Sequence, residues 1–192
     1  MQFPSKITDC NILCVTGQMA AGKNYICSQL EELGWHATDL DLTAHRAIEE
    51  CKEEIISAFK GEAERSGLSI VDSSGSINRR NLGRLLFKNP PLLARQESII
   101  YPKIIQLTKD FIKENGGNKI IINATVLFKT PVLLELCDAI VFVTAPFFTR
   151  LFRARRRDHL PFRQILRRFH AQKNLLEEYK KSGKPIIILK NS

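Results

Sequence analysis

The sequence has no run of apolar residues that approaches the roughly 18 that a membrane-spanning helix needs. It also has no CxxC pair and no cluster of cysteine and histidine with the spacing of a metal site. Its five cysteines are scattered, their number is odd, and no secretory signal segment precedes them. The sequence therefore predicts reduced thiols in a cytoplasmic protein that contacts no membrane.

Repeats and low-complexity linkers are absent too, and the 192 residues are predicted to form one domain. A chain of this length buries roughly 70% of its unfolded surface, which suffices for a stable core. The net charge of +9 favours an anionic partner, either a nucleotide or a nucleic acid. Because arginines gather between residues 150 and 170, a local phosphate site explains the charge at least as well as a nucleic-acid surface.

Short apolar runs have the composition of strands that are buried on both faces of a parallel sheet. Helical patterns separate them, so we predict an α/β fold with a five-stranded parallel sheet. Residues 42–114 repeat apolar positions at helical spacing and are predicted to be a helical insertion in the same domain. The predicted strands span residues 11–16, 35–39, 119–123, 139–144 and 185–189.

Directly after the first predicted strand, Gly17 to Lys23 spell G-x-x-x-x-G-K, and a helical pattern follows. This context predicts a phosphate-binding loop, and with it the three-layer P-loop NTPase fold, over a chance glycine-rich turn. Backbone N–H groups of such a loop surround an anion, and the lysine reaches the β- and γ-phosphates. We expect the nucleotide to be held by Gly17, Ala20, Ala21, Gly22, Lys23, Asn24 and Tyr25.

Asn24 stands where such loops have a serine or threonine, whose hydroxyl binds Mg²⁺. An amide oxygen also ligates a hard cation or accepts a hydrogen bond from metal-bound water, but the longer side chain changes the geometry. We therefore expect Asn24 to be a weak magnesium ligand beside an intact phosphate-binding loop.

Two acids, Asp39 and Asp41, follow the second predicted strand. On an extended chain a spacing of two puts both on one face, and ligands of open α/β sheets bind beyond the carboxyl ends of the strands. The pair is thus expected to face the phosphates held by Lys23, with one carboxylate as a base and the other holding a magnesium-bound water. An equally weighted alternative is that Asp41 caps the following helix.

Three arginines, Arg150, Arg153 and Arg157, share one face of a helix predicted at 147–157. Over a phosphate loop, such a face would neutralise charge on a phosphoryl group in transfer. A solvated basic face or a nucleic-acid patch is the alternative. The neighbouring apolar positions are predicted to pack as core and not to stack on bases: Phe148, Leu151 and Phe152 opposite the arginines, and Phe162, Ile165, Leu166 and Phe169 on a second helix with Pro161 in its first turn.

These motifs resemble the dephospho-CoA kinase family over essentially the whole chain. "DLDLTAH" (39–45) resembles the family's D-A-D-x-x-A-R, and "GSINRRNLGRLLFKNP" (75–90) its G-x-L-x-R-x-x-L-x-x-x-V-F-x-x-P. Each string is weak alone, but their common order and spacing are hard to obtain by chance. Further strings, "YPKI" (101–104), "NATVLFK" (123–129) and "VFVTAP" (141–146), stand where the family has H-P-x-I, D-I-P-L-L-F-E and V-x-V-D-A-P.

The resemblance implies a kinase that uses ATP and Mg²⁺ to phosphorylate the ribose 3′-hydroxyl of dephospho-CoA, the last step of coenzyme A synthesis. It implies Asp41 as the base, with Lys23, Arg150 and Arg157 as the other catalytic residues, and Asp39 as the contact to magnesium through water. The helical insertion and a lid at about 147–175 would enclose the substrate. By position, the substrate contacts would be Asp39, His45, Arg79, Tyr101 and Gln172, and Asn191 would contact the nucleotide.

Departures from the family pattern keep two other hypotheses open. One is a degenerate relative that binds nucleotide or CoA without efficient phosphoryl transfer, and the other is a basic nucleic-acid-binding P-loop protein. The departures remove two acids and turn one acid into a base, and the sequence leaves the oligomeric state open. They lie at Asn24, His45, Tyr101, Asn123, Thr125, Lys129 and Leu175.

Overall fold

The computed structural model describes residues 3–87 and 89–191. They form two units: a sheet unit, made of the residues up to Asp39 and from Phe111 onward, and a helical unit, Leu40–Asp110. The sequence predicted a helical insertion at 42–114. The last helix of that segment, Pro90–Glu114, crosses the boundary after Asp110 and therefore belongs to both units. Within the described residues, no helix combines the length and the apolar character that crossing a bilayer requires.

Apolar β-branched residues build the sheet of the sheet unit, and every strand pairing in it is parallel. The strand order is β2-β3-β1-β4-β5. Each predicted strand is confirmed to within one residue at either end. The strands are β1 (Ile12–Gly17), β2 (His36–Asp39), β3 (Ile120–Asn123), β4 (Ala139–Thr144) and β5 (Ile186–Lys190).

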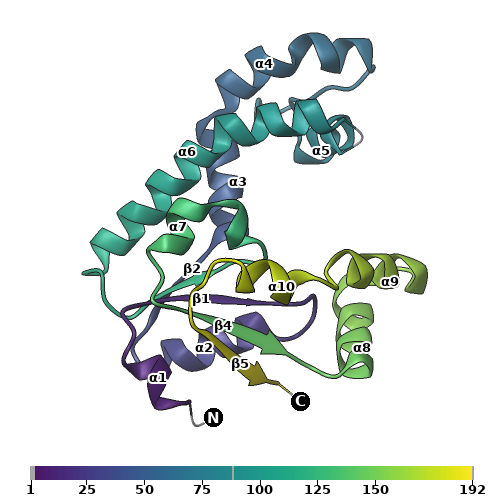
Figure 1. Cartoon of the computed structure of the whole chain (residues 1–192). Coiled ribbons are helices and arrows are strands. Elements are labelled where there is room, and N and C mark those ends of the chain that lie inside the picture. Colours follow the sequence, from purple (N-terminus) through teal and green to yellow (C-terminus); the bar gives the residue numbers. More distant parts are fainter. Residues whose placement is uncertain (1–2, 88, 192) are drawn as a thin grey trace. The chain divides into compact units, whose positions relative to one another are not determined.

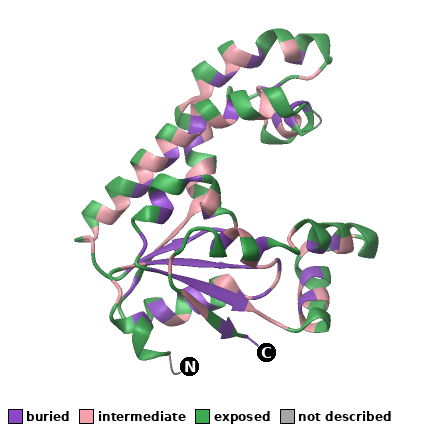
Figure 2. Cartoon of the chain, in the orientation of Figure 1, coloured by how far each residue is buried: buried purple, intermediate pink, exposed green. Residues whose placement is uncertain are grey.

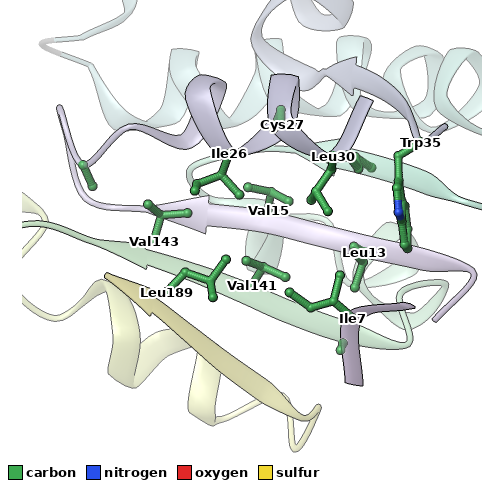
Figure 3. Close-up of a cluster of buried hydrophobic side chains, with 13 residues drawn as sticks. Ile7, Leu13, Val15, Ile26, Cys27, Leu30, Trp35, Val141, Val143 and Leu189 are labelled. Carbon is green, nitrogen blue, oxygen red and sulfur yellow. The ribbon is translucent and has the colours of Figure 1, made fainter. Parts of the chain in front are cut away.

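Helices cover both faces of this sheet (Figure 1). On one face, Ile26 and Leu30 pack against Leu13, Val15 and Val141 of the strands (Figure 3). The central strands β1, β3 and β4 are almost wholly buried, whereas β2 and β5 at the two edges are partly exposed and the helices expose their outer faces (Figure 2). The helices on that face are α1 (Ser5–Thr8) and α2 (Lys23–Glu31), and those on the other are α7 (Pro131–Glu135), after the short η1 (Leu127–Lys129), and α10 (Leu175–Lys180).

Strand register brings the ends of β1, β2 and β3 to one edge of the sheet. Asp39 pairs with Asn123, and Asn123 also lies beside Val15, two residues before Gly17. The phosphate loop, Asp39 and Asn123 therefore share the carboxyl edge, where open α/β sheets bind ligands.

The lid consists of α8 (Phe147–Asp158) and α9 (Phe162–Ala171). The helix predicted at 147–157 is confirmed, but the predicted packing of its aromatic residues is wrong. Phe148 and Phe152 are 78% and 69% exposed, and only Leu151 on that side packs against the lid core. The lid core contains Met19 of the phosphate loop together with Ala154, Ile165 and Phe169.

The phosphate loop decides which face of the lid is buried. Because α8 packs on the loop, the face with Arg150 and Ala154 turns inward and the phenylalanines turn to solvent. In α9 the prediction holds for Ile165 and Phe169, whereas Phe162 is exposed and Leu166 half-buried. Pro161 precedes the first turn of α9 instead of lying in it.

The helical unit is built from amphipathic helices around a small core of its own. Its buried side chains include Ile55, Phe59, Leu82 and Ile100. The Asn78 side chain caps one helix by accepting a hydrogen bond from the Asn81 N–H at 3.1 Å. The helices are α3 (Leu40–Glu50), α4 (Lys52–Arg65), α5 (Arg79–Leu86) and α6 (Pro90–Glu114), whose last four residues belong to the sheet unit.

Candidate active site

Two glycines of the phosphate loop have no room for a side chain. A Cβ at Gly17 would collide with the Val143 carbonyl oxygen, and one at Gly22 would collide with the Asn191 side-chain amide. Gly22 also has a φ of +96°, in the left-handed region that favours glycine. The sequence motif is therefore required by the packing around the loop as well as by the phosphate that it is expected to bind.

Side chains from the lid and from beyond β5 hold the loop at three points. The Arg150 guanidinium donates to the Gln18 side-chain oxygen. The Met19 N–H donates to Gln172 Oε1 at 2.6 Å. Asn191 Nδ2 donates to the Ala21 carbonyl at 2.9 Å. The sequence assigned Arg150 to catalysis, Gln172 to the substrate and Asn191 to the nucleotide. In the structure each of these three side chains contacts the loop itself.

Arg150 is a buried cation that contacts the loop through Gln18. It is only 7% exposed, its guanidinium lies 4.2 Å from the centre of the Phe169 ring, and its Nε has no hydrogen-bond partner. Burial lowers the pKa of Arg150, but an arginine stays protonated at neutral pH. Its position lets it carry positive charge to the loop without moving.

A cavity of about 520 Å³ opens over the end of the loop. Among the described residues that line it are four cations, Lys23, Arg153, Arg156 and Arg157, and no acid. Such a lining attracts a polyphosphate. The lining confirms that the face of α8 shared by Arg153 and Arg157 turns toward the loop. The sequence analysis did not include Arg156, because its position on the predicted helix does not show which other element of the fold it faces.

A second cavity, of about 470 Å³, continues past the loop and is lined by Gly22, Tyr25, Arg153 and Asn191. Arg153 Nη1 donates to the Asn191 carbonyl at 3.2 Å. An exposed tyrosine and a planar guanidinium offer faces on which an aromatic base stacks. Tyr25 and Asn191, both expected to contact the nucleotide, are therefore brought to one opening.

Asn24 and Asp39 are joined by a third residue, Asn123, which the predicted site did not include. Asn123 Nδ2 donates to Asn24 Oδ1 at 3.1 Å and to Asp39 Oδ2 at 3.3 Å. Asn123 ends β3 and is buried, so the register of the sheet fixes its amide at this edge. Its departure from the family pattern was the one sequence signal that marked it.

These oxygen atoms fit a magnesium ion that is held mainly by phosphates. The carboxylate of Asp39 and the amide oxygen of Asn24 are hard oxygen donors. The described residues contain no group of three or more histidine, cysteine, aspartate or glutamate side chains placed to hold a metal. Magnesium in kinases needs only one or two protein ligands beside the nucleotide, and this set provides them.

The two predicted acids do not lie together on an extended strand. β2 ends at Asp39, and α3 begins at Leu40, so Asp41 lies inside the first turn of the helix and not at the cap position before it. The spacing argument needs an extended chain through Asp41, whereas the helix already begins at Leu40. Asp39 belongs to the sheet unit and Asp41 to the helical unit. The role of Asp41 as a base stays a prediction.

The helical unit brings two of the predicted substrate contacts to one cavity. His45 and Arg79 line a space of about 220 Å³ whose other walls are mostly apolar. Arg79 also borders a second opening of about 570 Å³, together with Arg80, Arg84 and Phe87. Tyr101 lines neither of them. The pKa of Tyr101 is raised to about 12, mainly by burial and to a smaller extent by a hydrogen bond with Glu97.

A family model described as dephospho-CoA kinase matches residues 11–192. The dephospho-CoA kinase of Treponema denticola is 31% identical over 184 residues, which cover 94% of this chain and 82% of that protein. That of Treponema pallidum is 33% identical over 167 residues, covering 85% and 79%.

Solved structures share the fold of this chain. A crystal structure of a Thermus thermophilus protein matches with a TM-score of 0.78 at 25% identity, covering 95% of this chain and 88% of that one. The dephospho-CoA kinase of Campylobacter jejuni matches with a TM-score of 0.67 at 22% identity, covering 95% and 89%, and so shares the fold. With its phosphate loop, its basic cavity and a family match over nearly its whole length, the chain belongs to the dephospho-CoA kinase family.

Proposed function

We propose that this protein transfers the γ-phosphate of ATP to the ribose 3′-hydroxyl of dephospho-CoA and so produces coenzyme A. The observation that carries the proposal is the cavity over Gly22 and Lys23, whose described lining has three lid arginines and no acid. A phosphoryl group in transfer spreads negative charge over its oxygens, and fixed cations stabilise that charge.

The sheet unit would bind and orient ATP. Backbone N–H groups of the loop and Lys23 hold the phosphates, while Tyr25 and Asn191 border the opening available to the adenosine end. Asp39 and Asn24 would hold Mg²⁺, which neutralises charge on the phosphates when it is bound. Arg153, Arg156 and Arg157 would contact the phosphate chain from the lid.

The helical unit would bind dephospho-CoA and supply the base. Its cavity offers a histidine and an arginine, His45 and Arg79, among apolar walls, as suits a ligand with both phosphate and apolar parts. Asp41, exposed in the first turn of α3, would accept the proton of the ribose hydroxyl.

Since the five cysteines are all free, a reducing compartment such as the cytoplasm suits the protein.

An assay of ADP release tests the proposal directly. ADP should form from ATP and Mg²⁺ only when dephospho-CoA is present, in step with its consumption. An equal rate of ADP release with and without dephospho-CoA would contradict the proposed substrate.

A second function, nucleotide binding without transfer, is favoured by one specific observation. Asn24 and Asn123 both depart from the family pattern, and they meet in the site. If ATP raises the melting temperature and no coenzyme A forms at any Mg²⁺ concentration, this second function replaces the first.

A further inference from the structure

Two departures from the family pattern, 99 residues apart in the chain, form one hydrogen bond in the folded protein. Asn123 Nδ2 lies 3.1 Å from Asn24 Oδ1 and 3.3 Å from Asp39 Oδ2. A carboxylate only accepts hydrogen bonds, so the side of the Asn123 amide that faces Asp39 must be its NH₂ group. One amide group therefore serves two acceptors that come from different elements, the start of α2 and the end of β2.

The two asparagines are chemically matched to each other. An acid at position 123 could not donate to Asn24 Oδ1, and its charge would lie beside the Asp39 carboxylate. A serine at position 24 would withdraw the amide oxygen and leave the buried Asn123 amide with one acceptor fewer. Each substitution makes chemical sense in the presence of the other.

We propose that Asn123 is a positioning residue that holds Asn24 Oδ1 and Asp39 Oδ2 together until a magnesium ion takes the place of its N–H groups. The inference rests on the proposed use of ATP and Mg²⁺ at this loop. A site with a hydroxyl at position 24 and an acid at position 123 would carry one negative charge more than this one. Here, in addition, a hydrogen bond of Asn123 must break when the metal binds. Mg²⁺ is consequently taken up only at a raised concentration.

Metal-free thermal unfolding of the full chain gives the first test, because it needs neither nucleotide nor activity. Asn123→Asp should lower the melting temperature, and adding Asn24→Ser should recover at least half of that loss, since the shorter serine removes the amide oxygen that would otherwise face the new carboxylate. Additive losses in the double variant would overturn the proposal.

Calorimetric titration of ATP at a series of Mg²⁺ concentrations gives the second test. In the double variant Asn24→Ser/Asn123→Asp, the Mg²⁺ concentration for half-maximal tightening of ATP binding should fall about tenfold, and in Asn24→Ser alone less than about threefold. An unchanged midpoint in the double variant would refute the pairing. If ATP fails to bind the natural sequence at all, the proposed function and this inference fall together.

A control and a second cycle keep the result interpretable. Asn115→Asp likewise removes a donating side-chain amide, in this case one that donates to the Phe111 carbonyl at 2.8 Å, and it adds the same charge ahead of the amino end of β3. It should leave the Mg²⁺ midpoint unchanged. If Asn123→Asp does not fold, Asn123→Ala replaces it: Asn24→Ser should then lower the melting temperature in the natural background and not in the Asn123→Ala background. Equal losses in both would overturn the proposal.

Discussion

Arg150 and Arg157 share a face of α8, but their surroundings differ. Arg150 is buried against Phe169 and bonded to Gln18, so it cannot move without disrupting the lid core. Arg157 is exposed and borders the cavity, and its guanidinium pairs with Asp158 at 2.7 Å, which raises its pKa. An exposed ion pair is weak and easily exchanged for a phosphate contact. Arg157 is therefore the arginine that is free to follow the substrate.

Substituting Arg157→Ala should lower kcat by roughly 10- to 1,000-fold while weakening ATP binding by less than about fivefold, because its charge acts on the transferring group. Steady-state kinetics with both substrates, together with calorimetric ATP binding, measures the two effects. Arg155→Ala, an exposed arginine of the same helix outside the cavity lining, is the matched control. A loss of affinity with unchanged kcat would make Arg157 a binding residue only.

Asp41→Asn should reduce turnover by roughly 10²–10⁴-fold and leave ATP affinity nearly intact, as expected for the loss of a general base. Rapid-quench measurement of the transfer step is the direct readout. Glu49→Gln, on the exposed side of the same helix, controls for the lost charge. A loss of less than about threefold would leave Asp41 with the lesser role of an acid that stabilises the first turn of α3.

At this scale the sequence predicted the residues of local motifs and missed a partner that only the fold supplies. Gly17, Gly22 and Lys23 are recognisable because a phosphate loop is a continuous segment. Asn123 lies in another strand, and its contact with Asn24 depends on the register between β1, β2 and β3. No local pattern encodes that register.

Two of the three contacts that hold the loop come from the lid region, one from Arg150 in α8 and one from Gln172 just after α9. Gln172, just after α9, accepts the Met19 N–H, and Met19 in turn packs into the lid core with Ile165 and Phe169. The conformation of the loop therefore depends on the packing of the lid.

Gln172→Ala should weaken ATP binding by roughly five- to tenfold, because an N–H of the loop loses its acceptor and the loop samples other conformations. Isothermal titration calorimetry measures the change. Gln164→Ala, an exposed glutamine of α9, should bind ATP like the natural sequence. Equal affinity in both variants would show that water replaces Gln172 without consequence.

Element boundaries were predicted well, whereas the buried face of α8 was not. The strands are marked by apolar runs, and tertiary contacts do not alter that signal. The face of α8 is different: Phe148 and Phe152 give the apolar stripe that periodicity favours, yet the loop packs against Arg150 and Ala154 instead. An arginine that is buried by stacking and hydrogen bonding cannot be recognised from its hydrophobicity.

Three of the cysteines are buried in the sheet unit, and this makes stability sensitive to alkaline pH. Burial raises the pKa of Cys27 to about 12 and that of Cys137 to about 12, and it raises that of Cys14 well above the ordinary range. A raised folded-state pKa means that the unfolded chain loses these protons first. The stabilisation is complete below the unfolded pKa, about 8.5, and is lost progressively up to about pH 12.

We expect the free energy of unfolding to fall by about 1–2 kcal/mol per buried thiol between pH 8 and pH 10. Urea unfolding at several pH values measures the slope. Cys137→Val removes one of these thiols and should make the slope shallower, while Cys10→Ser, at a half-buried site, should change it less. Identical slopes in all three proteins would show that other groups govern the alkaline limit.

The three contacts that hold the phosphate loop join residues that are 132, 153 and 170 positions apart in the chain. The ribosome therefore makes the loop long before it makes the side chains that hold it. A nascent chain that already has β1 and α2 still lacks Arg150, Gln172 and Asn191, and its loop is free to take other shapes. Competence to bind nucleotide should consequently appear as the last event of biosynthetic folding, after the central strands have paired.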